Sequence, residues 1–306
     1  MTLRLPPPVR PGARVGVAAL SGPVDPLALQ AGLDALSELG FEPVPAANLS
    51  RRDDLFAGDD RERLEAFHAL AARPDLAAIF FARGGHGLLR LLPAIDWPLL
   101  AALPRAYVGY SDLTPLLAGV VDRLGLVAFH GPLVAADLAR GLAAEERDSL
   151  LGALAGELPA AIPFAGLASP WAGEPPRGRL VGGCLSMLSA TLGTEWFPRC
   201  RDAILFLEDV GEPLFRLDRM LTHLDLSGNL ARIRGIVIGA MRGTDEEPGA
   251  PSSVPARVAG RWAAVPVAFG LPAGHGAPNF TLPLGVPARF DPEAARLVLD
   301  RPEPPR

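Results

Sequence analysis

The sequence predicts an α/β protein with two domains, of which the first is built on a parallel, doubly wound sheet. Its 306 residues, 49% of them hydrophobic, are enough for two domains with separate cores. In the first half, short apolar runs alternate with helical patterns, which is typical of a parallel sheet. A stretch rich in proline and glycine at 157–178 interrupts the alternation. We therefore expect an N-terminal α/β domain at 1–156, a linker at 157–178 and a C-terminal domain at 179–306.

The elements of the first half follow from apolar runs and helical spacing. Strands are predicted at 14–19, 42–44, 76–81, 105–108 and 126–129. Helices are predicted at 26–39, 59–72 and 113–124. The first of these helices stops at Gly40, and the second begins with acidic residues, which favour a helix N-terminus.

The second half continues with both kinds of element and ends in extended chain. Strands are predicted at 179–181, 203–207, 234–239 and 265–269, and a closing hairpin at 287–299. Helices are predicted at 186–192, 214–226 and 252–263.

Composition excludes several classes of protein. A net charge of −5 gives no general attraction to nucleic acid or to anionic lipid. All 29 basic residues are arginine, so Schiff-base lysines, P-loop lysines and Ser–Lys dyads are excluded. Two cysteines, Cys184 and Cys200, are too few for a disulfide scaffold, and the histidines lack zinc-site spacing. The longest uncharged stretch, 263–288, contains five prolines and cannot be a membrane helix.

The first candidate for chemistry is Ser111, which lies between a predicted strand and a predicted helix. In open α/β sheets, sites form at the carboxyl ends of strands. Gly109-Tyr110-Ser111 follows such a strand and has the arrangement of a nucleophile elbow, in which a tight turn exposes the serine oxygen. Leu113 stands where such elbows usually have a second glycine. A serine that only caps the helix is the alternative.

Two further candidates follow predicted strands in the second half. Glu208 and Asp209 come directly after the run at 203–207, where an acid can orient a histidine as the third member of a triad. A helix-start acid or a surface turn is the alternative. His275 lies between two glycines after the run at 265–269 and has the strongest loop context of the five histidines. A solvated histidine without a partner is the alternative there.

The order Ser111, Glu208, His275 is the serine–acid–histidine order of many α/β hydrolases. The nucleophile would come from the first domain and the acid and base from the second. The sequence therefore places the candidate site in the cleft between the domains, where pockets are common.

Taken together, these segments resemble the LD-carboxypeptidases, a family of serine peptidases of the murein tetrapeptidase and microcin C immunity type. The matching pieces occur in order through nearly the whole chain: ARGGHG at 82–87 with RLLP at 90–93, GYSD at 109–112, HGP at 130–132, GRLVGG at 178–183, LED at 207–209, RLDRML at 216–221, GHG at 274–276, Asn279 and LPLG at 282–285.

Carried over position by position, the resemblance implies roles for five residues. Ser111 is the nucleophile, His275 is its base, and Glu208 is the acid that orients His275. The backbone N–H groups of Gly85 and Asp112 form the oxyanion hole. The resemblance also implies an N-terminal flavodoxin-like domain, a C-terminal swivelling β-rich α/β domain and, in many members, a homodimer.

Two positions depart from the family pattern. His86 stands where the family commonly has tyrosine, and Cys184 where it commonly has asparagine. Both lie near the implied pocket, so the departures concern substrate preference and leave the triad unchanged. His86 is therefore a candidate for substrate binding. Arg83 is another, because arginine pairs well with carboxylates, although it can equally support the loop.

The implied function is that of a serine LD-carboxypeptidase. Such an enzyme hydrolyses the amide between an L-configured centre, such as that of meso-diaminopimelate, and a C-terminal D-amino acid in peptidoglycan-derived peptides. It needs no metal and no organic cofactor. Because the N-terminus lacks the features of a secretory signal, we expect the protein to recycle wall peptides in the cytoplasm.

Two alternatives stay open at this stage. The same triad can serve a microcin-type hydrolase of peptidyl or aminoacyl nucleotides, with Trp171 or Trp196 as a stacking residue, although core or linker packing is the other role for both. A non-catalytic, two-lobed peptide- or sugar-binding protein is the alternative of another class. It predicts no close contact among Ser111, Glu208 and His275.

Overall fold

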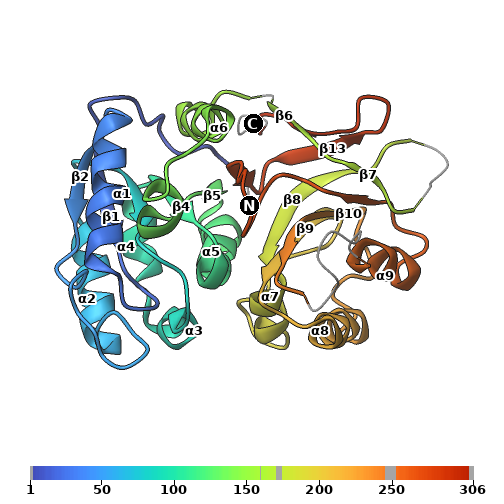
Figure 1. The fold of residues 1–306 in the computed structure, drawn as a ribbon, viewed down its shortest axis with the longest axis horizontal. Coiled ribbons are helices and arrows are strands. Elements are labelled where there is room, and N and C mark those ends of the chain that lie inside the picture. Colours follow the sequence, from blue (N-terminus) through green and yellow to red (C-terminus); the bar gives the residue numbers. More distant parts are fainter. Residues whose placement is uncertain (1–2, 159, 170–173, 245–252, 303–306) are drawn as a thin grey trace.

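The computed structural model describes residues 3–158, 160–169, 174–244 and 253–302. Two lobes lie side by side, each with its own sheet (Figure 1). The first sheet has the order β12-β5-β4-β3-β1-β2, and the second has the order β6-β14-β13-β8-β9-β10-β11-β7. This architecture confirms the predicted α/β class, with a parallel-sheet domain followed by a second, strand-rich domain.

Five strands of the first sheet are parallel, and their order is that of a flavodoxin-like domain. They are β1 (Arg14–Ala18), β2 (Glu42–Pro45), β3 (Leu76–Phe81), β4 (Ala106–Gly109) and β5 (Ala128–His130). The connecting helices are α1 (Pro26–Glu38), α2 (Asp60–Ala71), α3 (Leu88–Leu91), α4 (Trp97–Ala102), α5 (Thr114–Leu124) and α6 (Ala144–Ala155). Three shorter turns of helix are η1 (Leu92–Ala94), η2 (Ser111–Leu113) and η3 (Val134–Leu138).

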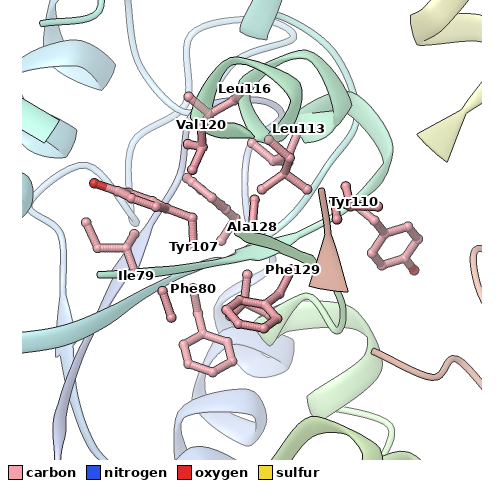
Figure 2. Packing of buried hydrophobic residues seen from close by; sticks show 14 of the residues in the cluster. Ile79, Phe80, Tyr107, Tyr110, Leu113, Leu116, Val120, Ala128 and Phe129 are labelled. Atoms are coloured by element: carbon pink, nitrogen blue, oxygen red, sulfur yellow. The ribbon is translucent and has the colours of Figure 1, made fainter. Parts of the chain in front are cut away.

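The central strands of this sheet are covered on both faces, which explains why they read as continuous apolar runs. Phe80 and Phe129 lie on one face of the sheet, while Tyr107 lies on the other with Leu116 and Val120 of α5 (Figure 2). All five side chains are at most 1% exposed. The core thus fixes β4 and α5, the two elements between which Ser111 lies.

The second sheet has a parallel centre with antiparallel edges. Its centre consists of β8 (Arg177–Cys184), β9 (Ala203–Val210), β10 (Gly235–Arg242) and β11 (Val267–Phe269). Its edges consist of β6 (Ala160–Pro163), β7 (Gly166–Leu167), β13 (Pro287–Asp291) and β14 (Arg296–Leu299). Its helices are α7 (Leu185–Thr191), α8 (Leu214–Leu226) and α9 (Val254–Arg261).

Local patterns predicted most of these elements well. The helix at 214–226 and the strand at 76–81 have the predicted bounds, and the closing hairpin is formed by β13 and β14. Residues 160–163 and 166–167, within the expected linker, form β6 and β7 because they pair with β14 and β11. Residue 252, at the start of the helix expected at 252–263, lies outside the described residues.

The two lobes are joined by more than a connecting chain. The strand β12 (Leu282–Leu284) belongs to the C-terminal part of the sequence but pairs with β5 of the first sheet. Helix α5 also packs against α7 and β8 of the second lobe. The carboxyl ends of β4 and β9 therefore meet across a fixed interface. Within the described ranges, the structure contains no helix long and apolar enough to cross a membrane.

Candidate active site

Ser111 lies on a sharp turn between β4 and α5. Its φ of +64° falls in the left-handed region, which non-glycine residues rarely adopt. Such a conformation costs about 1–3 kcal/mol and persists only where the surroundings enforce it. Here the buried strand β4 and the buried helix α5 impose it. The turn has the strand–serine–helix arrangement of a nucleophile elbow.

Glu208 and His275 come from the second lobe. Glu208 lies near the carboxyl end of β9, and its side chain is fully buried. His275 lies in the loop between β11 and β12, with 17% of its side chain exposed. Gly274 has a φ of +104°, and a Cβ there would lie 2.5 Å from Glu208 Oε2. Only glycine lets this loop approach the acid so closely.

The three side chains form one hydrogen-bonded line. Ser111 Oγ lies 3.0 Å from His275 Nε2, and His275 Nδ1 lies 2.7 Å from Glu208 Oε2. Glu208 Oε2 also accepts a hydrogen bond from the backbone N–H of His275 at 3.0 Å. The structure therefore brings together all three residues that the sequence predicted to meet. The close contact also contradicts what a non-catalytic, two-lobed binding protein predicts.

The electrostatics of the line suit proton transfer. Burial lowers the pKa of His275, but the hydrogen bond and the negative charge of Glu208 outweigh it, so the net pKa is raised above its ordinary 6.5. An acid that accepts from Nδ1–H leaves Nε2 free to accept the serine proton. The geometry thus presents an acceptor nitrogen to Ser111.

A second buried histidine, His130, lies beside this line. Its ring contacts Tyr110 and Phe206, with centroids 5.2 and 5.0 Å away. Burial lowers the pKa of His130 to about 4, so the ring is neutral near pH 7. Neither ring nitrogen has a hydrogen-bond partner in the described part of the chain. His130, from the HGP motif at 130–132, thus packs with Tyr110 and Phe206 in an aromatic cluster beside the triad.

The loop after β3 lies directly against the serine. A Cβ on Gly84 would lie 2.9 Å from Ser111 Oγ and 3.6 Å from the backbone nitrogen of Asp112. Gly85 follows with a φ of +107°, and Asp112 is buried directly after Ser111. The Asp112 carboxylate accepts from the backbone N–H of Leu88 at 2.9 Å, which ties the loop to the elbow. The two predicted oxyanion donors therefore belong to segments that touch at Ser111.

The two predicted substrate-binding residues lie on the same loop. Arg83 is exposed, and its guanidinium donates to the carbonyl of Pro23 at 2.7 Å. His86 is exposed, with its ring centroid 5.7 Å from that of Phe56. The Arg83 contact supports the loop, as its alternative interpretation stated, and the side chain also faces solvent. Both side chains are therefore accessible to a ligand.

Sequence reasoning missed the contacts that hold the elbow in place. Thr114 Oγ1 donates to the carbonyl of Ser111 at 2.8 Å and accepts from the backbone N–H of Cys184 at 3.2 Å. Cys184 is the register partner of Glu208 on the neighbouring strand. Asp209 turns away from the triad and accepts from Ser186 N at 2.7 Å, and burial raises its pKa to about 6. The alternation of β9 thus separates the two acids, Glu208 towards His275 and Asp209 towards α7.

In the described part of the chain, the other predicted features take no part in the hydrogen-bonded line of the triad. The thiol of Cys184 is buried beside Ser186 Oγ. Trp196 stacks on Trp97, with centroids 5.9 Å apart, and lines a cavity of about 390 Å³ between α5 and the segment 194–199. Trp171 lies outside the described residues. Across the described ranges, no three histidine, cysteine or acidic side chains gather as metal ligands would.

Comparison with known proteins agrees with this geometry. Residues 15–131 match the model of the LD-carboxypeptidase N-terminal domain, and residues 177–290 match that of the C-terminal domain. A Streptomyces coelicolor protein whose name assigns it to the carboxypeptidases is 39% identical, over 95% of this chain and 94% of its own. The murein tetrapeptide carboxypeptidase of Pseudomonas aeruginosa is 35% identical, over 88% and 91%.

Solved structures give the same result. The muramoyltetrapeptide carboxypeptidase of Oxalobacter formigenes superposes with a TM-score of 0.83 at 29% identity, over 95% of this chain and all of that one. The microcin immunity protein MccF, bound to glutamyl sulfamoyl guanosine, has the same fold, with a TM-score of 0.87 at 23% identity, over 97% and 98%.

The two-lobed fold and the serine–histidine–glutamate line define a hydrolase of the serine carboxypeptidase class. The chain belongs to the LD-carboxypeptidase family.

Proposed function

We propose that this protein hydrolyses the amide bond between an L-configured centre, such as that of meso-diaminopimelate, and a C-terminal D-amino acid in murein-derived peptides. The observation that carries the proposal is the line from Ser111 Oγ to His275 Nε2 and from His275 Nδ1 to Glu208 Oε2. The relatives from Pseudomonas aeruginosa and Oxalobacter formigenes, named for murein and muramoyl tetrapeptides, support the choice of substrate.

In the proposed mechanism, His275 accepts the proton of Ser111 while Ser111 Oγ bonds to the scissile carbonyl carbon. Glu208 holds the imidazole tautomer and stabilises the imidazolium. The N–H groups of Gly85 and Asp112 bind the oxyanion, and each such donor lowers the barrier by about 3 kcal/mol. The C–N bond then breaks as His275 returns its proton to the leaving amine. Water, activated by His275, finally hydrolyses the acyl-enzyme.

Arg83 and His86 are the proposed contacts to the substrate. A C-terminal D-amino acid carries a free carboxylate, and an exposed guanidinium on the loop next to Ser111 is a suitable partner. His86 lies on the same loop and offers an aromatic face and two ring nitrogens. Its difference from the tyrosine that is common in the family would adjust preference among peptides.

We further propose that the enzyme works on wall peptides in the cytoplasm as a homodimer, without nucleic acid or membrane partners. The net charge of −5, which gives no general attraction to phosphate-rich surfaces, supports the last point. The reaction as written uses only side chains, backbone N–H groups and water, so it requires neither a metal nor an organic cofactor.

One alternative substrate class has its own support. The microcin C7 self-immunity protein of Escherichia coli is 27% identical over 93% of this chain. A related activity here would cleave the amide of a peptidyl or aminoacyl nucleotide with the same triad. Trp196 offers no stacking surface at the triad, because it packs on Trp97 and beneath Arg123. Because the relatives named for murein and muramoyl tetrapeptides are more similar to this chain, we propose the murein peptide as the substrate.

The test is product analysis by mass spectrometry with L,D-tetrapeptides, D,D-pentapeptides and an acyl-sulfamoyl adenylate. We expect release of D-alanine from the L,D-tetrapeptides alone, and a loss of at least about a thousandfold in Ser111→Ala with its thermal midpoint nearly unchanged. Cleavage of the adenylate alone would select the microcin-type function. Full hydrolysis by Ser111→Ala would refute the assignment of the nucleophile.

A further inference from the structure

The loop that carries His275 is held by the first lobe as well as by the second. The backbone N–H of Asn279 donates to Glu146 Oε1 at 2.7 Å, although the two residues are 133 positions apart. Glu146 lies in the first turn of α6, and its side chain is only 1% exposed. It is the only described side chain that accepts this N–H. The first lobe, which carries Ser111, thus makes a hydrogen bond to the loop of the second lobe that carries His275.

Glu146 is itself fixed from two other directions. Its Oε2 accepts from the backbone N–H of Ala143 at 2.8 Å, and its Oε1 lies 2.5 Å from Arg140 Nη2. Burial raises the pKa of Glu146, but Arg140 and the two backbone donors outweigh it and lower the net pKa. The carboxylate is therefore charged near neutral pH and locked in one orientation.

Asn279 connects Glu146 to Gly274, the residue directly before His275. Its side chain is buried, and Oδ1 accepts from the backbone N–H of Gly274 at 2.9 Å. Gly274 is pressed against Glu208, since a Cβ there would lie 2.5 Å from Glu208 Oε2. His275 follows directly. The position of Gly274 therefore sets the distances from His275 to both Glu208 and Ser111.

A second branch of the same network supports the imidazole from the side. The ring of Tyr110 meets that of His275 edge-on, with centroids 4.8 Å apart. The Tyr110 hydroxyl donates to Asp137 Oδ1 at 3.4 Å, and Arg140 Nη2 lies 3.5 Å from the same carboxylate oxygen. Arg140 thus joins the branch through Glu146 to the branch through Tyr110.

We propose that Glu146 is a positioning residue for His275. Through Asn279 and Gly274, it holds the imidazole of one lobe at proton-transfer distance from the serine of the other. This inference rests on the proposed function, in which His275 is the base. Glu146 bonds to Asn279, Ala143 and Arg140 rather than to the triad, so it acts on the proton-transfer step and not on substrate binding.

The decisive variants are Glu146→Ala, Glu146→Gln and Asn279→Ala, assayed for kcat and KM on an L,D-tetrapeptide. A displacement of about 1 Å in a catalytic group can cost about a hundredfold, so we expect Glu146→Ala and Asn279→Ala to lower kcat by about 30-fold or more. KM should change less than about twofold, because ground-state binding is untouched. Glutamine keeps an acceptor for Asn279 N–H, so Glu146→Gln should recover most of the lost kcat.

Ser149→Ala is the matched control. Ser149 Oγ lies on the same helix and accepts from the backbone N–H of Thr281 at 3.0 Å, two residues beyond Asn279 and off the path to Gly274. This variant loses a hydrogen bond of the same interface, and its kcat should stay within about twofold of the wild type. If Glu146→Ala fails to fold, Asn279→Ala still tests the path to the base, because it removes the hydrogen bond between Asn279 Oδ1 and the N–H of Gly274 and leaves the Arg140–Glu146 pair in place.

Three results would overturn the proposal: wild-type kcat in Glu146→Ala, wild-type kcat in Asn279→Ala, or an equal loss of kcat in Ser149→Ala. Its failure can be told apart from failure of the proposed function. If Ser111→Ala is inactive while the Glu146 and Asn279 variants turn over normally, only the positioning role is wrong. If Ser111→Ala is active, the triad itself is wrong.

Discussion

At the scale of single residues, the site keeps two unfavourable arrangements that a stable fold would otherwise avoid. Ser111 adopts a left-handed backbone, and Glu208 has a fully buried carboxylate whose Oε1 has no hydrogen-bond partner in the described ranges. Each costs stability, and the surrounding core offsets both. Such residues are typical of functional sites, where stability is exchanged for a reactive geometry.

The charge of Glu208 should set the pH at which His275 works. As the proposed base, His275 must be neutral to accept a proton, and its pKa is raised above 6.5, so kcat/KM should fall as the pH drops through that raised value. In Glu208→Gln the largest raising influence on the pKa of His275 is lost, while burial and the smaller raising effects of Asp209 and Asp137 remain, so the pKa should move below that of the wild type. NMR titration of the His275 ring measures this directly in both proteins.

A control for that titration is Asp300→Asn, which removes one negative charge on the far hairpin, where Asp300 pairs with Arg289. It should leave the His275 titration in place. An unchanged or higher pKa of His275 in Glu208→Gln would show that a group other than Glu208 raises this pKa in the wild type.

At the scale of elements, the loop after β3 should be sensitive to a single methyl group. The backbone of Gly84 is outside the left-handed region, so alanine fits its conformation, yet its Cβ would lie 2.9 Å from both Ser111 Cβ and Oγ. We expect Gly84→Ala to fold but to lose about a hundredfold or more in kcat, because the methyl displaces Ser111, the proposed nucleophile. Circular dichroism tests whether the variant folds, and steady-state kinetics measures the loss of kcat.

Gly260→Ala, on α9, is the comparison for Gly84→Ala, since a Cβ at Gly260 would have no atom within 4 Å apart from its own helix backbone and chain neighbours. It should retain full turnover. Normal turnover in Gly84→Ala as well would mean that the loop can move away from Ser111, and that it does not fix the proposed oxyanion donors.

Sequence reasoning found elements whose signal is local and missed those whose partners are distant. The helix at 214–226 has helical periodicity, the strand at 76–81 is a continuous apolar run, and the hairpin of β13 and β14 is closed by nearby residues. β12 has no such signal, because Leu282–Leu284 becomes a strand only by pairing with β5. The segments β6 and β7 likewise become strands through β14 and β11.

The same distinction applies to the site. Ser111, Glu208 and His275 could be proposed because each follows a predicted strand; a glycine also lies two residues before Ser111, and glycines flank His275. The hydrogen bond from Asn279 to Glu146 could not, because it joins residues 133 positions apart and one of its partners is a backbone N–H. Thr114 was missed for the same reason, since its partner is the backbone of Cys184.

At the scale of the whole molecule, one hydrophobic core spans both lobes, while a second core lies within the second lobe alone. The main hydrophobic core includes Val108 and Phe129 of the first sheet together with Phe206 and Phe290 of the second. Strand β12, the Glu146–Asn279 bond and the Thr114–Cys184 bond add backbone links between the lobes. Separation of the lobes would expose this core and break these links together.

We therefore expect thermal unfolding in one cooperative transition, with a calorimetric enthalpy equal to the van't Hoff enthalpy. Trp196→Ala tests how far the lobe contact contributes. Trp196 of the second lobe stacks on Trp97 of the first, and the Arg123 guanidinium lies 4.1 Å from the Trp196 ring centroid. Loss of the aromatic pair and the cation–π contact should lower the free energy of unfolding by about 1–3 kcal/mol.

The transition of Trp196→Ala should stay single and kcat should stay close to the wild type, because the triad has its own links across the interface. Phe215→Ala is the control, since this ring is 58% exposed and contacts Arg219 within the second lobe. Its effect on unfolding should be well below that of Trp196→Ala. Two resolved transitions in the wild type would mean that each lobe folds alone, and the fixed interface inferred for the triad would then be wrong.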